Sequence, residues 1–454
     1  MKKDRISPVR LIPVSFLLAV LAGTVLLLLP AATAPGEDTD FLTALFTATT
    51  SVCVTGLVVA DTYAHWSVFG QAVILVLIQI GGLGVISVAS VIMLAVKKKF
   101  YLRDHMLLGD SLNVDMKKGP LPFLIHILKG VFIVESIGAV VFALKFVPSL
   151  GWGRGLRTAV FHSISSFCNA GMDIIGPNSL MDLRESPLVM WATMVLIVFG
   201  GLGFVVWFDL IDGIRSGIRN RFSPRTILRH LPEHRRIVLV LTAGLILFGT
   251  VSVFAAEYNN PDTIGNMPLS QKLLNSLFQS VTFRTAGFAS IPQDKLTDVT
   301  CVIGCVLMFI GGSPVGTAGG IKTVTAFLFF MNALSYIRGE KENVIFNRRV
   351  PEEQMKKASA IVFISLTTAL VMAVLLLSRG GISLTDALYE VVSALGTVGL
   401  SRGLTPTLDA AGQIIIILSM FLGRVGPITM AIMFTKGSGS TNSIKHAEGI
   451  FYVG

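Results

Sequence analysis

The chain has 454 residues, of which 52% are hydrophobic and only 14% are charged, whereas a soluble globular protein carries roughly 25% charged residues. This composition excludes an ordinary soluble protein and favours an integral membrane protein, with membrane lipid as its surroundings. The formal net charge of +10 would suit a nucleic-acid-binding protein, but the basic residues lie in a few separate segments, so no nucleic-acid partner is predicted.

Apolar runs of about the length that spans a bilayer as a helix, roughly 20 residues, recur along the chain. They predict eight spans, at about 11–29, 68–96, 121–147, 186–208, 236–256, 297–335, 358–377 and 407–433. The first run resembles a secretory signal. It is longer than the roughly 7–15 apolar residues of a signal, and Pro35 would follow the cleavage site, so we interpret it as a span.

Lysine and arginine concentrate in alternate connections between these spans. Of the 37 basic residues, four lie in 1–10, six in 97–118, seven in 209–236 and six in 338–357. This is the positive-inside pattern, in which cytoplasmic segments are basic. Both termini are therefore predicted to be cytoplasmic, and each pair of spans leaves and returns to the same side of the membrane.

An internal repeat divides the chain into four parts. Between the two spans of each pair lies a shorter segment, at about 38–50, 154–166, 268–282 and 383–394, that ends in a glycine turn. The last turn glycines are Gly56, Gly171, Gly287 and Gly399, which are 115, 116 and 112 residues apart. The second span of each repeat then carries a further element, namely Gly81-Gly-Leu-Gly84, Gly200-Gly-Leu-Gly203, Gly311-Gly-Ser-Pro314 or Gly423-Arg-Val-Gly426.

The short segments predict re-entrant loops. A dozen residues form roughly 18 Å of helix, which does not cross a hydrocarbon core of about 30 Å, so each segment must enter and turn back. Such a loop is tolerated only where protein surrounds it or where it lines a water-filled path. Four loops, one per repeat, can surround a single axis.

The turns predict a cation filter made of backbone carbonyl groups. Each short helix directs the negative end of its dipole at its turn, which favours a cation, and the turns hold almost no carboxylate, so carbonyl oxygens must replace the hydration shell of a weakly hydrated ion such as potassium. Glycine permits the positive φ that aims successive carbonyls inward. The predicted filter residues are Val52, Cys53, Val54, Thr55, Gly56, Phe167, Cys168, Asn169, Ala170, Gly171, Phe283, Arg284, Thr285, Ala286, Gly287, Leu395, Gly396, Thr397, Val398 and Gly399.

A gate is predicted in the third repeat, where five glycines and a proline within 311–320 exclude a regular helix. The halves at about 297–310 and 323–337 would each extend only about 21–23 Å, so the loop lies near mid-depth, as a plug in the pore or, alternatively, as a packing kink. Arg424 is the only basic residue in the final span and is placed to donate hydrogen bonds to the loop and to repel a passing cation. The predicted gate residues are Gly311, Gly312, Ser313, Pro314, Gly316, Thr317, Gly319, Gly320, Lys322 and Arg424.

No enzyme is predicted, because the chain lacks a zinc-protease motif, a nucleophile elbow and a phosphate-binding loop. The four cysteines are too few for a disulfide framework. Cys301 and Cys305 have a metal-like spacing, but no histidine lies near them in the sequence, so we interpret them as membrane-core cysteines. No organic cofactor is predicted on this chain.

Taken together, these motifs resemble the Ktr/Trk/HKT superfamily of cation transporters. The similarity rests on the four turns (VCVTG, FCNAG, FRTAGF and LGTVGL), on GGSPVGTAGGIK and on GRVGP, and it covers about 11–454. Length and the C-terminal sequence FYVG are most similar to the KtrB membrane subunits. The first two turns depart from the family by having a cysteine, Cys53 or Cys168, three residues before the glycine.

The resemblance implies an all-α integral membrane fold with four M1-P-M2 units, each a helix, a re-entrant pore helix with its filter loop and a second helix, around one central pore. It implies homodimers, gating by a cytosolic nucleotide-binding ring of the KtrA type, and an intramembrane gate formed by the loop 311–320 with Arg424. The expected parts are a cytoplasmic N-terminus (1–10), repeats at 11–98, 119–212, 233–337 and 352–433, and a cytoplasmic C-terminal tail (434–454).

The expected function is potassium uptake across the bacterial cell membrane. A sodium-permeable or sodium-coupled transporter of the same superfamily is the alternative. A secondary transporter with inverted repeats is disfavoured, because inversion requires an odd number of spans per repeat, and a receptor-like scaffold is disfavoured by the register of the four turns.

Charges within spans are candidates for function. Glu135 lies in the middle of a span and is expected to be paired or to face a cavity, with no role assigned. Arg284 lies in the third turn, and we expect it to point behind the filter and to pair with a carboxylate such as Glu390.

Overall fold

The computed structural model describes residues 8–84, 120–220, 231–314, 316–340, 342–426 and 429. These residues are mostly helical, as predicted, and their only strands, β1 (Val344–Ile345) and β2 (Arg348–Arg349), form a short antiparallel hairpin. The helices are α1 (Pro8–Leu27), α2 (Phe41–Cys53), α3 (Val68–Leu83), α6 (Pro120–Leu150), α7 (Trp152–Cys168), α8 (Pro187–Leu202), α9 (Phe204–Asn220), α11 (Glu233–Glu257), α12 (Leu269–Phe283), α13 (Asp298–Phe309), α14 (Thr323–Ile337), α15 (Glu352–Leu377), α16 (Leu384–Gly396) and α17 (Ala410–Val425), with single 3-10 turns at Pro30–Ala32, Met181–Leu183 and Thr405–Thr407.

Three described helices, α6, α11 and α15, are each long and apolar enough to cross a membrane, and α8 with α9 would supply a fourth span if that bent pair is counted as one. The long helices present apolar side chains outward. Leu144, Leu247 and Phe363 are 67%, 66% and 69% exposed. Such a surface is stable against lipid, and the hydrogen bonds of a helix satisfy its backbone there.

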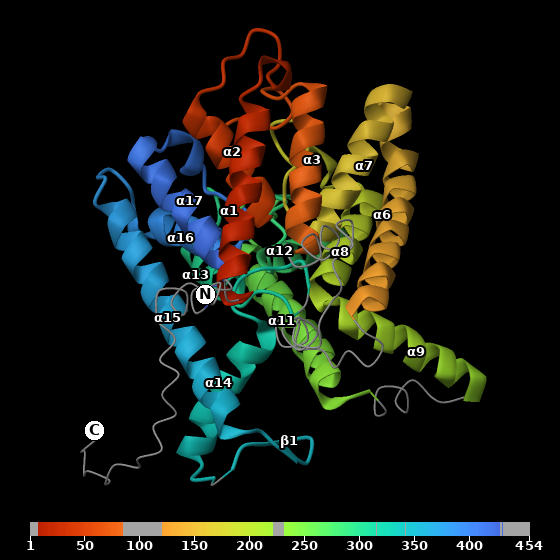
Figure 1. Cartoon of the computed structure of the whole chain (residues 1–454), viewed down its shortest axis with the longest axis vertical. Coiled ribbons are helices and arrows are strands. Elements are labelled where there is room, and N and C mark those ends of the chain that lie inside the picture. Colours follow the sequence, from red (N-terminus) through yellow and green to blue (C-terminus); the bar gives the residue numbers. More distant parts are fainter. Residues whose placement is uncertain are drawn as a thin grey trace, which may run out of the picture.

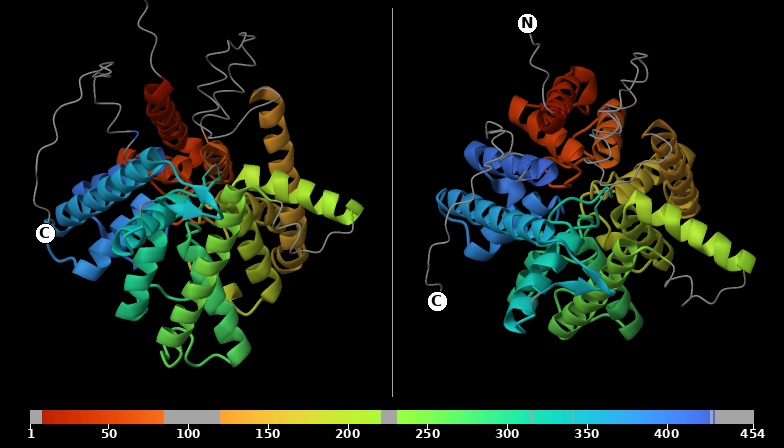
Figure 2. Two further views of the ribbon diagram at one scale, coloured as in Figure 1. Left: turned by 90° about the horizontal axis from the view of Figure 1, so that it is seen from below. Right: turned by 60° about the horizontal axis from the view of Figure 1, so that its bottom comes forward.

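The helices form four groups (Figure 1), and the packing between helices of neighbouring groups closes them into a ring. In each group a short helix (α2, α7, α12 or α16) packs against the helix before it and the helix after it. Contacts between the groups run in one sense, since α3 packs against α7, α8 against α12, α13 against α16, and α17 against α2. The views in Figure 2 show the four groups around a common centre.

Local sequence determines where the short helices begin and end. Asp40 and Ser383 cap α2 and α16, because their side chains accept hydrogen bonds from the backbone N–H groups of Thr43 and Asp386. The short helices hold 13 to 17 residues, somewhat more than the dozen predicted. α2, α7 and α16 end at a residue in the left-handed conformation.

The second helix of every group ends at its glycine element. α3, α8 and α17 end at Gly84, Gly203 and Gly426, where φ is +78°, +88° and +92°. The predicted span 186–208 is therefore not one helix, because α9 is bent by 103° from α8. In the third group α13 ends at Phe309 and α14 begins at Thr323. The predicted spans 68–96 and 407–433 lie partly outside the described residues.

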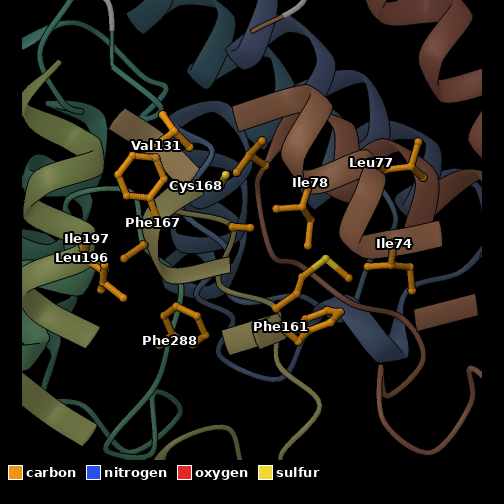
Figure 3. Packing of buried hydrophobic residues seen from close by; sticks show 14 of the residues in the cluster. Ile74, Leu77, Ile78, Val131, Phe161, Phe167, Cys168, Leu196, Ile197 and Phe288 are labelled. Atoms are coloured by element: carbon orange, nitrogen blue, oxygen red, sulfur yellow. The ribbon is translucent and has the colours of Figure 1, made fainter. Parts of the chain in front are cut away.

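The first glycine of the element lets the second helix approach the short helix of its own group. A Cβ atom added to Gly81, Gly200 or Gly423 would overlap a backbone carbonyl oxygen, that of Val52, Phe167 or Leu395. Apolar side chains complete this packing. Figure 3 shows one cluster that draws Ile78 from α3, Phe167 and Cys168 from α7, and Ile197 from α8.

Gly200→Ala is expected to lower the free energy of unfolding by about 1–3 kcal/mol, because an added methyl group in a filled site costs that much. Gly201→Ala is the matched control, since its Cβ would lie 3.6 Å from the Asn169 amide nitrogen, an ordinary van der Waals distance. Thermal unfolding of both variants in detergent measures the difference. A Gly200→Ala protein as stable as Gly201→Ala would contradict the close approach.

Candidate ion pathway

The four turns share an unusual backbone conformation. Non-glycine residues with positive φ precede the last turn glycine by two positions in every repeat, namely Val54, Asn169, Thr285 and Thr397, with φ of 55°, 58°, 73° and 51°. The last glycines, Gly56, Gly171, Gly287 and Gly399, have φ of 100°, 66°, 84° and 94°. β-Branched residues rarely adopt positive φ, and such strain persists only where the surroundings impose it. Positive φ at alternate residues turns successive carbonyls toward one side.

These turns meet one another in a closed ring. A Cβ atom added to Gly56 would overlap the carbonyl oxygen of Ala170 in the second turn. The same relation joins Gly171 to Ala286, Gly287 to Val398, and Gly399 to Thr55. The carbonyl of the residue before each turn glycine thus lies against the glycine of the preceding repeat, and the four oxygens surround one axis.

Hydroxyl groups of the short helices hold the turns in place. Thr50 and Ser393 accept hydrogen bonds from the backbone N–H of Gly56 and Gly399, at 2.9 and 3.1 Å. In the other two repeats a hydroxyl of the short helix donates to the carbonyl that follows the turn, Ser165 to Met172 at 2.5 Å and Thr282 to Phe288 at 2.7 Å. Sequence reasoning missed these hydroxyls, although serine or threonine five or six residues before each turn glycine was a usable signal.

The predicted filter residues therefore lie together, but their side chains point in different directions. The cysteine side chain of the second turn packs away from the axis, because the Cys168 sulfur lies 3.9 Å from the side-chain oxygens of Gln79 and Glu135. Glu135 itself is buried at 4% exposure and accepts hydrogen bonds from the Gln79 amide at 3.0 and 3.2 Å. Its partner is thus an amide of the first repeat and not a charge.

The predicted gate loop packs directly against the turns. The backbone N–H groups of Ser313 and Thr317 donate to the carbonyls of Gly201 and Gly200, at 2.9 and 3.1 Å, and the Thr317 hydroxyl donates to the Phe167 carbonyl at 3.1 Å. The loop glycine Gly319 leaves no space for a side chain, since a Cβ atom there would overlap the Thr397 hydroxyl of the fourth turn. Lys322 donates back to the Ala318 carbonyl at 2.6 Å.

Arg424 joins this loop to the first repeat. Its Nη1 atom donates to the Thr317 carbonyl at 2.5 Å and its Nη2 atom donates to the Gly81 carbonyl. Both acceptors are backbone oxygens, and no carboxylate among the described residues lies within ion-pair distance of the guanidinium. The guanidinium thus links the loop to the end of α3 through backbone oxygens alone.

The predicted pair of Arg284 and Glu390 is wrong. Arg284 points behind its turn but donates to the Thr242 and Gly311 carbonyls and to the Thr323 hydroxyl. Glu390 lies in α16 and is fully buried. It is satisfied there by the backbone N–H groups of Arg402 and Leu404 and by the hydroxyls of Ser401 and Thr405. Local N–H groups of the following loop are closer partners than an arginine of another repeat, so no ion pair forms.

Comparison with known proteins gives a consistent result. The family described as TrkH, cation transport protein, matches residues 15–445. Ktr system potassium uptake protein B of Bacillus subtilis (strain 168) is 37% identical over 454 residues, which cover 99% of this chain and 97% of that protein. Potassium/sodium uptake protein NtpJ of Enterococcus hirae is 35% identical over 457 residues, with 100% and 98% covered.

A solved structure has the same fold. The crystal structure of the potassium transporter TrkH from Vibrio parahaemolyticus superposes with a TM-score of 0.70, at 18% identity, over 96% of this chain and 86% of that one. The family match and the identities of 35–37% over nearly full length establish more than a shared fold. The chain belongs to the TrkH family of cation transport proteins.

Proposed function

We propose that this chain carries potassium into the cell along the axis that the four turns surround. The observation that carries the proposal is the closed ring in which each turn glycine lies against the carbonyl of the next turn. Oxygens held in this way replace the hydration shell of a cation. The names of the relatives from B. subtilis and E. hirae, which are potassium and potassium/sodium uptake proteins, support the choice of ion.

The arrangement of helices fits four M1-P-M2 units around one pore. In each unit α2, α7, α12 or α16 runs into its turn, so the negative ends of four helix dipoles face the same axis and favour a cation over an anion. The filter then consists of Val52–Gly56, Phe167–Gly171, Phe283–Gly287 and Leu395–Gly399. The carbonyl groups that face the ion belong to the residues directly before the turn glycines, namely Thr55, Ala170, Ala286 and Val398.

The loop 311–320, with Lys322 and Arg424, acts as the gate of this pathway. Its support is geometric, because the loop lies against the second and fourth turns and is held by an arginine whose charge is not neutralised by a carboxylate among the described residues. A cation that leaves the filter must pass this segment. Retraction of the loop opens the pathway.

A cytosolic nucleotide-binding ring of the KtrA type is the proposed regulatory partner, and the working unit is a homodimer in the bacterial cell membrane with both termini in the cytoplasm. The basic segments of the sequence support this orientation. The Ktr system named for the relatives from B. subtilis and Vibrio alginolyticus supports the partner. No organic cofactor is required on this chain.

A sodium-permeable or sodium-coupled transporter is the second candidate. Its support is the name of the E. hirae relative, a potassium/sodium uptake protein. The presence of glycine at all four turns favours potassium, because a ring with four well-aimed carbonyls disfavours the smaller and more strongly hydrated sodium ion.

Gly56→Ser is expected to lower the ratio of potassium to sodium uptake by roughly tenfold, or about 1.4 kcal/mol, because its Cβ would overlap the Ala170 carbonyl at φ +100°. Gly36→Ser is the matched control, since Gly36 has φ +90° but no atom within 4 Å of an added Cβ. Both ratios are measured in liposomes. If Gly56→Ser reaches the membrane and keeps the parent ratio, the filter assignment is wrong.

Deletion of 314–319, or Arg424→Ala, is expected to raise potassium flux about fivefold or more, which is the lower end of the effects that one regulatory site typically has on another. The flux of these variants is also expected to depend less on the cytosolic partner. Arg379→Ala is the control, because that arginine contacts Asp409 and not the loop. Flux in liposomes with and without the partner decides the outcome. Variants as tightly partner-dependent as the parent would show that the loop is scaffold.

A further inference from the structure

Arg284 occupies a position that is otherwise filled by short side chains. Three residues before the last turn glycine, the equivalent residues are Cys53, Cys168 and Gly396. In the fourth turn a Cβ atom at Gly396 would lie 2.5 Å from the Met308 carbonyl, so no side chain fits there. The third turn alone carries a long donor at this point, and this donor reaches the gate loop.

The guanidinium holds both ends of that loop. Its Nη2 atom donates to the Gly311 carbonyl at 3.3 Å, where the loop begins, and to the Thr323 hydroxyl at 3.4 Å, where α14 begins. Thr323 also donates to Gly311 at 3.1 Å. The Nη1 atom donates to the Thr242 carbonyl in α11 at 3.4 Å. The Arg284 side chain thus connects the third turn to the first residue of the loop, to the start of α14 and to α11.

This connection can be released. The three distances are longer than the usual 2.9–3.0 Å of an N–H···O bond, and the acceptors are neutral. The Nε atom is buried and has no hydrogen-bond partner among the described atoms. A cavity of about 20 Å³ beside the guanidinium, lined in part by Gly201 and Gly312, leaves space for it to shift.

The backbone of the third turn depends on what holds Arg284. The next residue, Thr285, is β-branched and has φ +73°, a conformation that persists only when its surroundings impose it. Its hydroxyl is hydrogen-bonded to the Asn169 amide at 3.3 Å, so a change in the third turn reaches the second. A displacement of the loop at Gly311 would break the bond that Arg284 makes to it.

We propose that Arg284 is a positioning residue that couples the gate loop to the filter, so that the position of the loop sets how well the third turn discriminates between potassium and sodium. This inference rests on the proposed function of the turns and loop. Coupling between two sites is reciprocal, so an ion that fits the third turn also stabilises one position of the loop. The position of the gate loop and the ion preference of the filter then change together.

The test changes the loop end of the connection and measures selectivity. Thr323→Val removes the hydroxyl and leaves every turn residue in place, and Arg284→Gln removes the charge from the turn end. Each single variant of the full chain in liposomes is expected to lower the ratio of potassium to sodium uptake by about fivefold or more, the lower range of such couplings. The double variant is expected to be no lower than the worse single variant, because both remove one connection.

Thr300→Val is the matched control, a buried threonine in α13 whose hydroxyl bonds to Thr297 and not to the loop or turn. It should keep the parent ratio. The inference is overturned if Thr323→Val keeps the parent ratio, or if the double variant shows the product of the two single effects. Should Arg284→Gln fail to reach the membrane, Thr323→Val against Thr300→Val decides alone. A parent chain without preference for potassium would instead refute the proposed function.

Discussion

Irregular backbone at the depth of membrane-spanning helices is tolerated only where protein surrounds it or where it lines a water-filled path, because lipid offers no hydrogen-bond partners. The proposed pathway places two kinds of irregular backbone there, the four turns and the loop 311–320. The loop finds hydrogen-bond acceptors at the ends of the helices beside the second turn. Ser313 and Thr317 donate to carbonyls at the end of α8, and the Thr317 hydroxyl donates to the end of α7.

The same constraint explains why small residues are so frequent in these segments. At Gly81, Gly200 and Gly423 the second helix touches the carbonyl end of the short helix, and at the turn glycines one repeat touches the next. These contacts leave no space for a Cβ atom. The ring of turns is therefore built from backbone alone, and the side chains that remain, mainly Ser and Thr hydroxyls, bind the N–H and carbonyl groups that do not face the axis.

The spacing of the turn glycines was sufficient to predict that the four turns meet, but the sequence did not predict the partners of buried charges or every helix end. The turn glycines recur at regular intervals because each repeat must return the chain to the same ring, so their meeting point was predictable. The pairing of Arg284 with Glu390 was not, because charge alone does not tell which of several buried acceptors is nearest, and backbone carbonyls carry no sequence signal. The end of α8 at Gly203 was missed, because a glycine element in an apolar run also suits simple helix packing.

A carbonyl filter selective for potassium is most directly tested by the uptake of the two ions into liposomes that contain the parent chain, first each ion alone and then both in competition. The ring of four carbonyls predicts rapid potassium uptake that excess sodium barely slows. Equal uptake of both ions, or sodium uptake that excess potassium does not suppress, would contradict it.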